Sequence, residues 1–312
     1  MIVEASAGWG ARVEDDVGGL LGRLTATARR MRSGSDPEAI HDLRVAARRL
    51  ASALDVWRAL LKRGARRRAR RALRRLRRAL GPVREAEVEA ATLRERLENL
   101  PPAARDAATR LLASLERRIA RGRPRAAERC AEDRIARIRR RIARAFARAR
   151  TTEGGALLPT VAARLHARAR GARDAVRAAA ADPRDETLHQ ARLAAKRCRY
   201  ALERLAAAGP PFDALTARAR IEPLVAVQEA LGRARDLAML RDRAQRYARK
   251  LGIAGHGAAA SPLEPLLERL ESERREALVL FMRSVAALHA VGTEPASLGL
   301  AGGAPRRGAD RR

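Results

Sequence analysis

The sequence predicts an all-α protein. Alanine, leucine, arginine and glutamate dominate it, whereas β-branched and aromatic residues are sparse, with Phe, Trp and Tyr together at 2%. This composition favours helices throughout the chain. No segment shows a sustained alternation of polar and apolar residues, so we expect no β-strands. Because 46% of the 312 residues are hydrophobic, the helices can bury a substantial core.

Helix boundaries are predicted where glycine, proline and short polar residues interrupt this pattern. The intervals between the interruptions accommodate helices of about three to eight turns. The last stretch, residues 292–312, is rich in Gly, Pro, Ala and Arg, and we expect a flexible basic tail there. In chain order the interruptions are Ser33–Pro37, Gly64, Gly81–Pro82, Pro101–Pro102, Gly122–Pro124, Thr151–Gly155, Asp182–Pro183, Gly209–Pro211, Gly232, Gly252–Ser261 and Gly292.

An internal repeat divides the helical region. Residues Ile40–Leu50 align with Leu188–Cys198 at an offset of 148 positions, and an Asp-Pro pair precedes each copy. A second motif follows in both copies, with Leu80–Glu85 aligned to Leu231–Asp236. Two motifs in the same order at nearly equal spacing predict two related helical halves, residues 12–150 and 156–291, joined near Thr151–Gly155.

The first copy of the repeat predicts an amphipathic helix. At 100° per residue, His41, Arg44 and Arg48 fall on one side. The opposite side is apolar. A rise of 1.5 Å per residue separates successive cations by about 5 Å along the axis, which suits the phosphates of an extended polymer. The apolar residues are Leu43, Ala46, Leu50, Leu54, Trp57 and Leu61.

The second copy predicts the same two faces. His189, Arg192, Lys196 and Arg199 share the cationic side. Guanidinium groups keep their charge and can grip phosphate oxygens with two parallel hydrogen bonds. A row of arginines on one helix is also typical of a solvated surface, but its repetition at a fixed phase favours a binding role. The apolar side contains Ala191, Cys198, Leu202 and Leu205.

Two carboxylates and two further arginine rows accompany the repeat. Asp55 and Glu203 each follow a histidine by 14 positions, and we expect them to orient nearby arginines. The segment Gly64–Leu80 contains nine arginines and no acid, so a bound anion would relieve its self-repulsion. The stripes are Arg67, Arg70, Arg71, Arg74 and Arg78, opposite Ala69, Ala72, Leu73, Leu76 and Leu80, and then Arg134, Arg137, Arg141, Arg144 and Arg148, beside Ile135, Ile138, Ile142 and Phe146.

The second motif, Leu-Gly-x-x-Arg-Asp/Glu, is interpreted as a helix end, a glycine turn and the start of a new helix. The acid of the motif would then lie in the first turn, where the helix dipole favours a negative charge. This role is structural. The arginine of the motif can still reach a ligand.

The charge balance predicts a polyanionic partner. Basic residues outnumber acidic ones by 67 to 36, which gives a formal net charge of +31, and only three of the basic residues are lysines. A chain of this charge repels itself unless anions gather on it. The low aromatic content disfavours a platform on which single-stranded bases would stack.

The sequence points to the cytoplasm. Cys130 and Cys198 are isolated, so we expect free thiols in a reducing compartment. No apolar run reaches the length of about 18 residues that a membrane span needs, and we expect no membrane association. Residues 1–16 lack the pattern of a secretory signal.

The two motifs together resemble the CHAD family, the conserved histidine α-helical domain. The resemblance rests on His-x-x-Arg-x-x-x-Arg/Lys-Arg, followed about 40 residues later by Leu-Gly-x-x-Arg-Asp/Glu, twice in the chain. It covers about residues 12–291. It implies two pseudo-symmetric antiparallel four-helix bundle halves that enclose a basic channel or groove binding inorganic polyphosphate, and an association with bacterial polyphosphate granules.

The resemblance also implies a set of ligand contacts. The first copy has Glu85 where the family has Asp, and Ala51-Ser52 where the second copy has Arg199-Tyr200, so the two halves need not contribute equally. The Glu-x-Glu-x-Lys signature of the triphosphate-tunnel hydrolase domain, to which members are often fused, is absent. The implied polyphosphate contacts are His41, Arg44, Arg48, Arg49, Arg84, His189, Arg192, Lys196, Arg197, Arg199, Tyr200 and Arg235.

Two other functions are compatible with the residues. His41-Asp42 invites comparison with metal-dependent HD phosphohydrolases, but its counterpart is His189-Gln190 and the other histidines lack carboxylates at metal-ligand spacing. We therefore expect no catalysis, no cofactor and no metal site. Non-specific nucleic-acid binding at low salt is expected from charge alone. The histidines either donate to phosphate or only bond to neighbouring protein groups, and the sequence favours neither role.

Overall fold

The computed structural model describes residues 9–34, 36–147, 157–209, 214–250, 252 and 261–290. Within these ranges all regular structure is helical, which confirms the predicted class. The predicted tail at 292–312, the junction Thr151–Gly155 and most of Gly252–Ser261 lie outside the described residues.

The helices follow one another with short connections. Residues 12–150 contain α2 to α6, where α5 and α6 are separated only by a turn at Cys130 and Ala131, and residues 156–291 contain α7 to α10. The helices are α2 (Trp9–Ser33), α3 (Ala39–Val56), the 3-10 helix η1 (Arg58–Leu60), α4 (Arg63–Leu97), α5 (Pro102–Arg129), α6 (Glu132–Phe146), α7 (Leu157–Ala181), α8 (Asp185–Ala207), α9 (Ala214–Lys250) and α10 (Glu264–Ala290).

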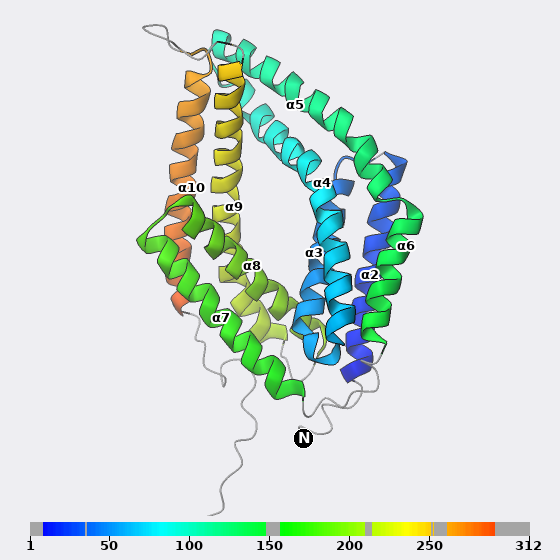
Figure 1. The fold of residues 1–312 in the computed structure, drawn as a ribbon. Helices are drawn as coiled ribbons and strands as arrows, with labels where there is room; N and C mark the ends of the chain where they lie inside the picture. The colour runs from blue at the N-terminus through cyan, green and yellow to red at the C-terminus, as the bar shows by residue number, and fades with distance from the viewer. Residues whose placement is uncertain are drawn as a thin grey trace, which may run out of the picture.

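Sequence neighbours pack side by side, and the two parts of the chain meet through the repeated helices. Figure 1 shows α9 beside α10 and α7 beside α8, in agreement with their contacts. The helix of the first repeat copy, α3, contacts the helix of the second copy, α8, and α4 contacts α9. The segments that carry the repeated motifs therefore lie at the junction of the two parts.

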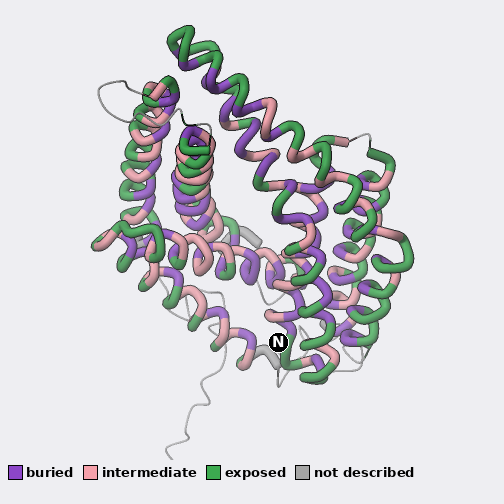
Figure 2. The backbone as a smooth tube through the Cα atoms, turned by 45° about the horizontal axis from the view of Figure 1, so that its top comes forward, coloured by how far each residue is buried: buried purple, intermediate pink, exposed green. Residues whose placement is uncertain are grey.

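The predicted apolar faces form the core. Leu43 and Trp57 of the first copy, and Ala191 and Cys198 of the second, are at most 2% exposed and belong to one cluster that spans both parts of the chain. A second cluster joins the C-terminal ends of α4 and α9 to α5 and α10. Figure 2 shows buried residues recurring along each helix, as expected for amphipathic helices packed on a shared interior.

Three predicted interruptions are wrong, because helices continue through them. Gly81–Pro82 lies inside α4, Gly122–Pro124 inside α5 and Gly232 inside α9. In a helix interior glycine costs about 1 kcal/mol and proline about 3 kcal/mol relative to alanine. Burial of the neighbours Leu80 and Val83 offsets that cost. Figure 1 shows α4 changing direction midway, the expected result of an internal proline.

Candidate anion-binding cavity

The repeated helices enclose a cationic cavity. This central cavity has a volume of about 560 Å³ and is lined by α3, α4, α8 and α9, with Arg168 contributed by α7. Nine arginines and one lysine line it, against four carboxylates. The surplus of positive charge gives the cavity a positive potential that attracts anions.

On α3 the predicted cationic row lines the central cavity. His41, Arg44 and Arg48 all contribute to its wall, while Leu43 and Leu50 on the opposite face are fully buried. The helical period therefore directs the apolar residues to the core and the cations to the cavity.

On α8 the equivalent row faces the same cavity. His189, Arg192 and Lys196 line it together with Arg197 and Tyr200. Arg48 of α3 donates a hydrogen bond from Nη1 to Oη of this tyrosine at 3.4 Å. The two repeat copies thus present their cations to one shared concavity.

Two of the predicted ligand contacts do not line the central cavity. Arg49 lies on α3 outside its wall. The guanidinium of Arg199 stacks over the ring of Tyr200, 4.9 Å from its centroid, and pairs with Glu203 at 3.3 Å. For Arg199 these two contacts account for the exception, because they hold its guanidinium outside the wall. Arg199 instead fixes the tyrosine.

Both carboxylates that were expected to orient arginines do so. Asp55 lies 2.6 Å from Arg70 and 3.5 Å from Arg66, nitrogen to oxygen. Glu203 pairs with Arg199, as described above.

The Leu-Gly-x-x-Arg motifs support the cavity from mid-helix positions. A Cβ placed on Gly81 would lie 3.5 Å from Nη1 of Arg44, and one on Gly232 would lie 3.9 Å from Nε of Arg192. Each glycine therefore sits beneath an arginine of the neighbouring repeat helix. A side chain longer than alanine would occupy the space of that guanidinium.

The arginine of each motif also lines the central cavity. Arg84 is held by ion pairs with Glu38 at 3.7 Å and Glu87 at 3.6 Å. Arg235 lies with its Nη1 3.4 Å from Nδ1 of His189. Sequence reasoning that treated the motif as a turn still identified these two arginines.

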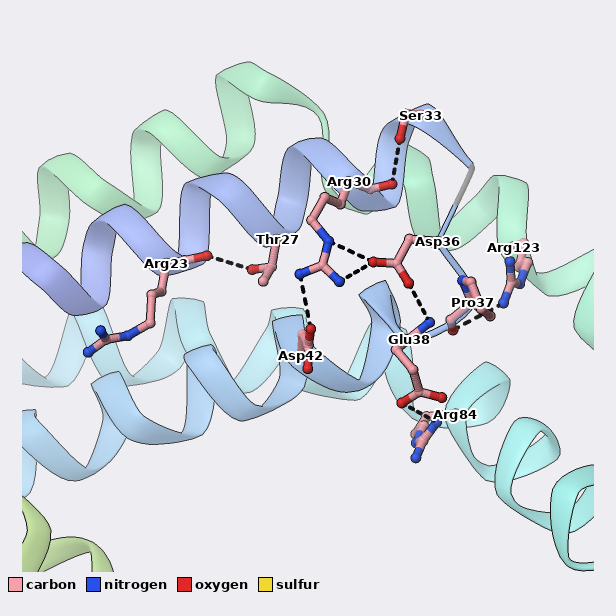
Figure 3. Close-up of polar contacts among 10 residues, drawn as sticks. All are labelled: Arg23, Thr27, Arg30, Ser33, Asp36, Pro37, Glu38, Asp42, Arg84 and Arg123. Carbon is pink, nitrogen blue, oxygen red and sulfur yellow. Dashed lines mark hydrogen bonds and ion pairs between the residues drawn. The ribbon is translucent and has the colours of Figure 1, made fainter.

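The start of α3 is fixed by a polar network, drawn in Figure 3. Oδ1 of Asp36 accepts a hydrogen bond from the backbone N–H of Glu38 at 2.8 Å, and its Oδ2 accepts one from Nε of Arg30 at 2.6 Å. Arg123 donates to the carbonyl of Pro37 at 3.3 Å and pairs with Glu87 at 2.9 Å. The loop before His41 is thereby tied to α2 and α5.

Burial and mutual repulsion lower the pKa values of two cavity cations, Arg44 and Lys196. Burial, followed by repulsion from Arg48, lowers the pKa of Arg44 to about 10. Burial, followed by repulsion from Arg192 and Arg48, lowers the pKa of Lys196 to about 7. An anion that entered the cavity would relieve this repulsion and favour the protonated forms.

The two histidines are biased towards their neutral forms. Burial and the nearby Arg84 lower the pKa of His41, and burial and Arg235 lower the pKa of His189. Because a guanidinium only donates hydrogen bonds, Nδ1 of His189 accepts from Arg235 and its Nε2 carries the proton.

Other cavity residues were absent from the predicted set. Asp236, the acid of the second motif, is inside α9 and not in a first turn, which corrects that prediction, because α9 continues past Gly232. Burial raises its pKa, against the opposing effect of Arg192 and Lys196. Arg77 belonged to the arginine-rich segment and was a recognisable candidate, whereas nothing in the sequence distinguished Arg168 from other arginines.

The described part of the chain contains neither a cluster of metal-ligating side chains nor a helix that could span a membrane. No group of three or more His, Cys, Asp or Glu side chains there is arranged to hold a metal ion. None of its helices combines the length and apolarity that crossing a bilayer requires.

Comparisons with known proteins agree with this architecture. The structure is similar to the crystal structure of the CHAD domain from the plant Ricinus communis, with a TM-score of 0.71 and 24% identity over 93% of this chain and 94% of that one. It is also similar to PptA from Streptomyces chartreusis, with a TM-score of 0.66 and 22% identity over 90% and 99% of the two chains. No curated protein matches the sequence significantly.

The family model of the CHAD domain matches residues 17–245, which include both copies of the histidine motif and both glycine motifs. The resemblance seen in those motifs is thereby confirmed, and the chain belongs to the CHAD family.

Proposed function

We propose that this protein binds inorganic polyphosphate in the central cavity and does not hydrolyse it. The observation that carries the proposal is the convergence of the two repeat copies, because the cationic rows of α3 and α8 line one concavity and meet through Arg48 and Tyr200. The chain belongs to the CHAD family, and the resemblance of its motifs to that family implies this ligand. A granule of polyphosphate is the cellular form in which we expect the ligand.

The chemistry of the wall supports a phosphate polymer over a single small anion. Cations lie along both repeated helices and not at one point. Guanidinium groups separated by one helical turn can each take a different phosphate of an extended chain. Arg44 and Arg192 are central to this arrangement, since each packs over the glycine of a neighbouring helix.

The test is a binding titration with long-chain polyphosphate at physiological salt. Arg44→Glu combined with Arg192→Glu should weaken binding by at least about 100-fold, because hydrogen bonds to charged groups contribute about 1.5–3 kcal/mol each. Arg141→Glu combined with Arg144→Glu, on the exposed face of α6, is the matched control with the same change of charge. Equal losses in the two variants would reject the cavity as the site.

Two further outcomes distinguish the competing functions. Duplex DNA that displaces polyphosphate at equal phosphate concentration and physiological salt would indicate a nucleic-acid-binding protein. Release of phosphate from polyphosphate with added Mg²⁺ or Mn²⁺, abolished by His41→Ala, would indicate a phosphohydrolase. We expect neither.

A further inference from the structure

A second cationic concavity adjoins the central cavity. It has a volume of about 910 Å³ and lies along the first half of α4, facing α3, and we call it the α4 groove. Arg44, Arg70 and Arg77 line both concavities, together with Ala51 and Glu85. The two spaces therefore share part of their walls. Nη1 of Arg44 donates to the carbonyl oxygen of Arg77 at 2.6 Å, which fixes the side chain at the junction.

The α4 groove carries positive charge that the surrounding protein leaves unbalanced. Seven arginines of α4 line it, and the carboxylates that line or touch it are Glu85 and Asp55, the latter paired with Arg66 and Arg70. Across the described part of the chain, four exposed arginines of the groove have no ion-pair partner: Arg67, Arg71, Arg74 and Arg78.

The free arginines are arranged as a line. From Arg67 to Arg78 the helix rises about 16 Å, at 1.5 Å per residue. Beside this line, Arg70 and Arg77 of α4 and Arg44 of α3 also line the central cavity. A linear anion that filled the cavity could continue along this line without leaving contact with guanidinium groups.

The arginine row of the groove has no counterpart in the sequence of the first part of α9. The matching first part of α9, residues 214–231, contains only Arg218 and Arg220, and it also carries Glu222 and Glu229. Arg218 is paired with Glu222 at 3.2 Å. The arginine row that adjoins the central cavity on α4 is therefore not repeated on α9.

We infer that the α4 groove is a second subsite for polyphosphate, which binds the part of a long chain that extends beyond the central cavity. This inference rests on the proposed function. The cavity alone would hold short chains, and the groove would give long chains an additional affinity. No aromatic side chain lines the groove, so it offers no surface on which nucleic-acid bases could stack.

The experiment compares short and long ligands on two matched variants. Arg71→Ala, Arg74→Ala and Arg78→Ala together remove three exposed, unpaired charges of the groove and leave every residue that also lines the central cavity in place. The control removes the same number of exposed charges from α6, by Arg140→Ala, Arg141→Ala and Arg144→Ala. Alanine favours helix, so both variants should fold, and circular dichroism checks this. Tripolyphosphate and long-chain polyphosphate are titrated into each protein.

The groove variant should bind tripolyphosphate within about twofold of the wild type but long chains at least about tenfold more weakly. The slope of log affinity against log salt for long chains should fall by about 2, at roughly 0.7 per lost phosphate contact on a single-stranded polyanion. The α6 variant should retain both affinities and the slope.

Each other result has a separate meaning. Equal long-chain affinity in the wild type and the groove variant, or equal losses in the groove and α6 variants, would overturn the inference while the proposed function stands. Loss of tripolyphosphate binding in the groove variant would also overturn it, because the groove would then be the primary site. A wild type that binds neither ligand would reject the proposed function itself. Groove-dependent binding of duplex DNA in preference to long-chain polyphosphate would reassign the groove to nucleic acid.

Discussion

Lys196 is the cavity residue whose charge changes most readily near neutral pH. Its pKa of about 7 reflects burial and the neighbours Arg192, Arg48 and Arg199, opposed by Asp236. A bound polyanion stabilises the ammonium and raises this pKa. Above pH 7 binding must therefore take up a proton, and the affinity falls as the pH rises.

For the wild type we expect the dissociation constant for polyphosphate to increase between pH 7 and pH 9, by at most about tenfold per pH unit for one linked proton. Lys196→Arg keeps its charge over this range, so its profile should be flatter. Titrations at pH 7, 8 and 9 at constant ionic strength measure the difference. Parallel profiles for the two proteins would mean that Lys196 does not change its protonation on binding.

The histidines should respond at lower pH. Both pKa values are below the ordinary value, so a ligand that favours imidazolium gains affinity as the pH falls from 8 to 6. The double variant His41→Gln and His189→Gln should lose this part of the pH dependence. Identical profiles for the wild type and the double variant would leave the histidines a structural role only.

At the scale of the element, sequence patterns located faces better than ends. The 3.6-residue period correctly assigned Leu43 and Leu54 to the core and Arg44 to the opposite side. The helix-breaking tendency of glycine wrongly predicted helix ends at Gly81 and Gly232, where tertiary packing beside arginines of other helices outweighs local propensity. Those contacts join residues far apart in the chain, and no local signal reports them.

At Gly122, α5 packs tightly against Val83 of α4. A Cβ at this position would lie 2.6 Å from Cγ2 of Val83, a buried side chain. Gly122→Ala should therefore destabilise the protein by about 1 kcal/mol net, because overpacking costs about 1–3 kcal/mol and alanine regains up to about 1 kcal/mol of helix propensity.

Gly171→Ala is the matched control for that measurement. Gly171 is exposed in α7 and a Cβ there meets no atom within 4 Å, so the substitution should be neutral or stabilising. The midpoints of urea unfolding report both changes. A Gly122→Ala protein as stable as the wild type would show that α4 and α5 separate without cost.

At the scale of the whole molecule, buried ion pairs join the two parts of the chain. Arg204 of α8 pairs with Asp16 of α2 at 2.5 Å, and both side chains are 8% exposed. Arg243 of α9 pairs at 3.0 Å with Glu89, which lines the central cavity. The sequence does not predict these long-range ion pairs, because none of the four residues lies in a repeated motif.

Arg204→Met should destabilise the protein by about 3 kcal/mol or more, because it leaves the carboxylate of Asp16 buried without its partner. Adding Asp16→Leu should recover much of this loss, since an apolar pair of similar volume avoids the desolvation of both charges. Urea unfolding of the two single variants and the double variant completes the cycle. Additive losses would show that the pair is not coupled.

The contact between Arg48 and Tyr200 lies where the two parts of the molecule face each other across their crowded cations. A ligand that occupies that space binds the folded protein and not the unfolded chain, so it stabilises the fold by about 2.7 kcal/mol at a ligand concentration of 100 times the dissociation constant. Cellular proteases degrade the unfolded fraction of the protein. The lifetime of the protein would then lengthen when the polymer accumulates and shorten when it is consumed, so that protein levels would follow the phosphate store without a change in transcription.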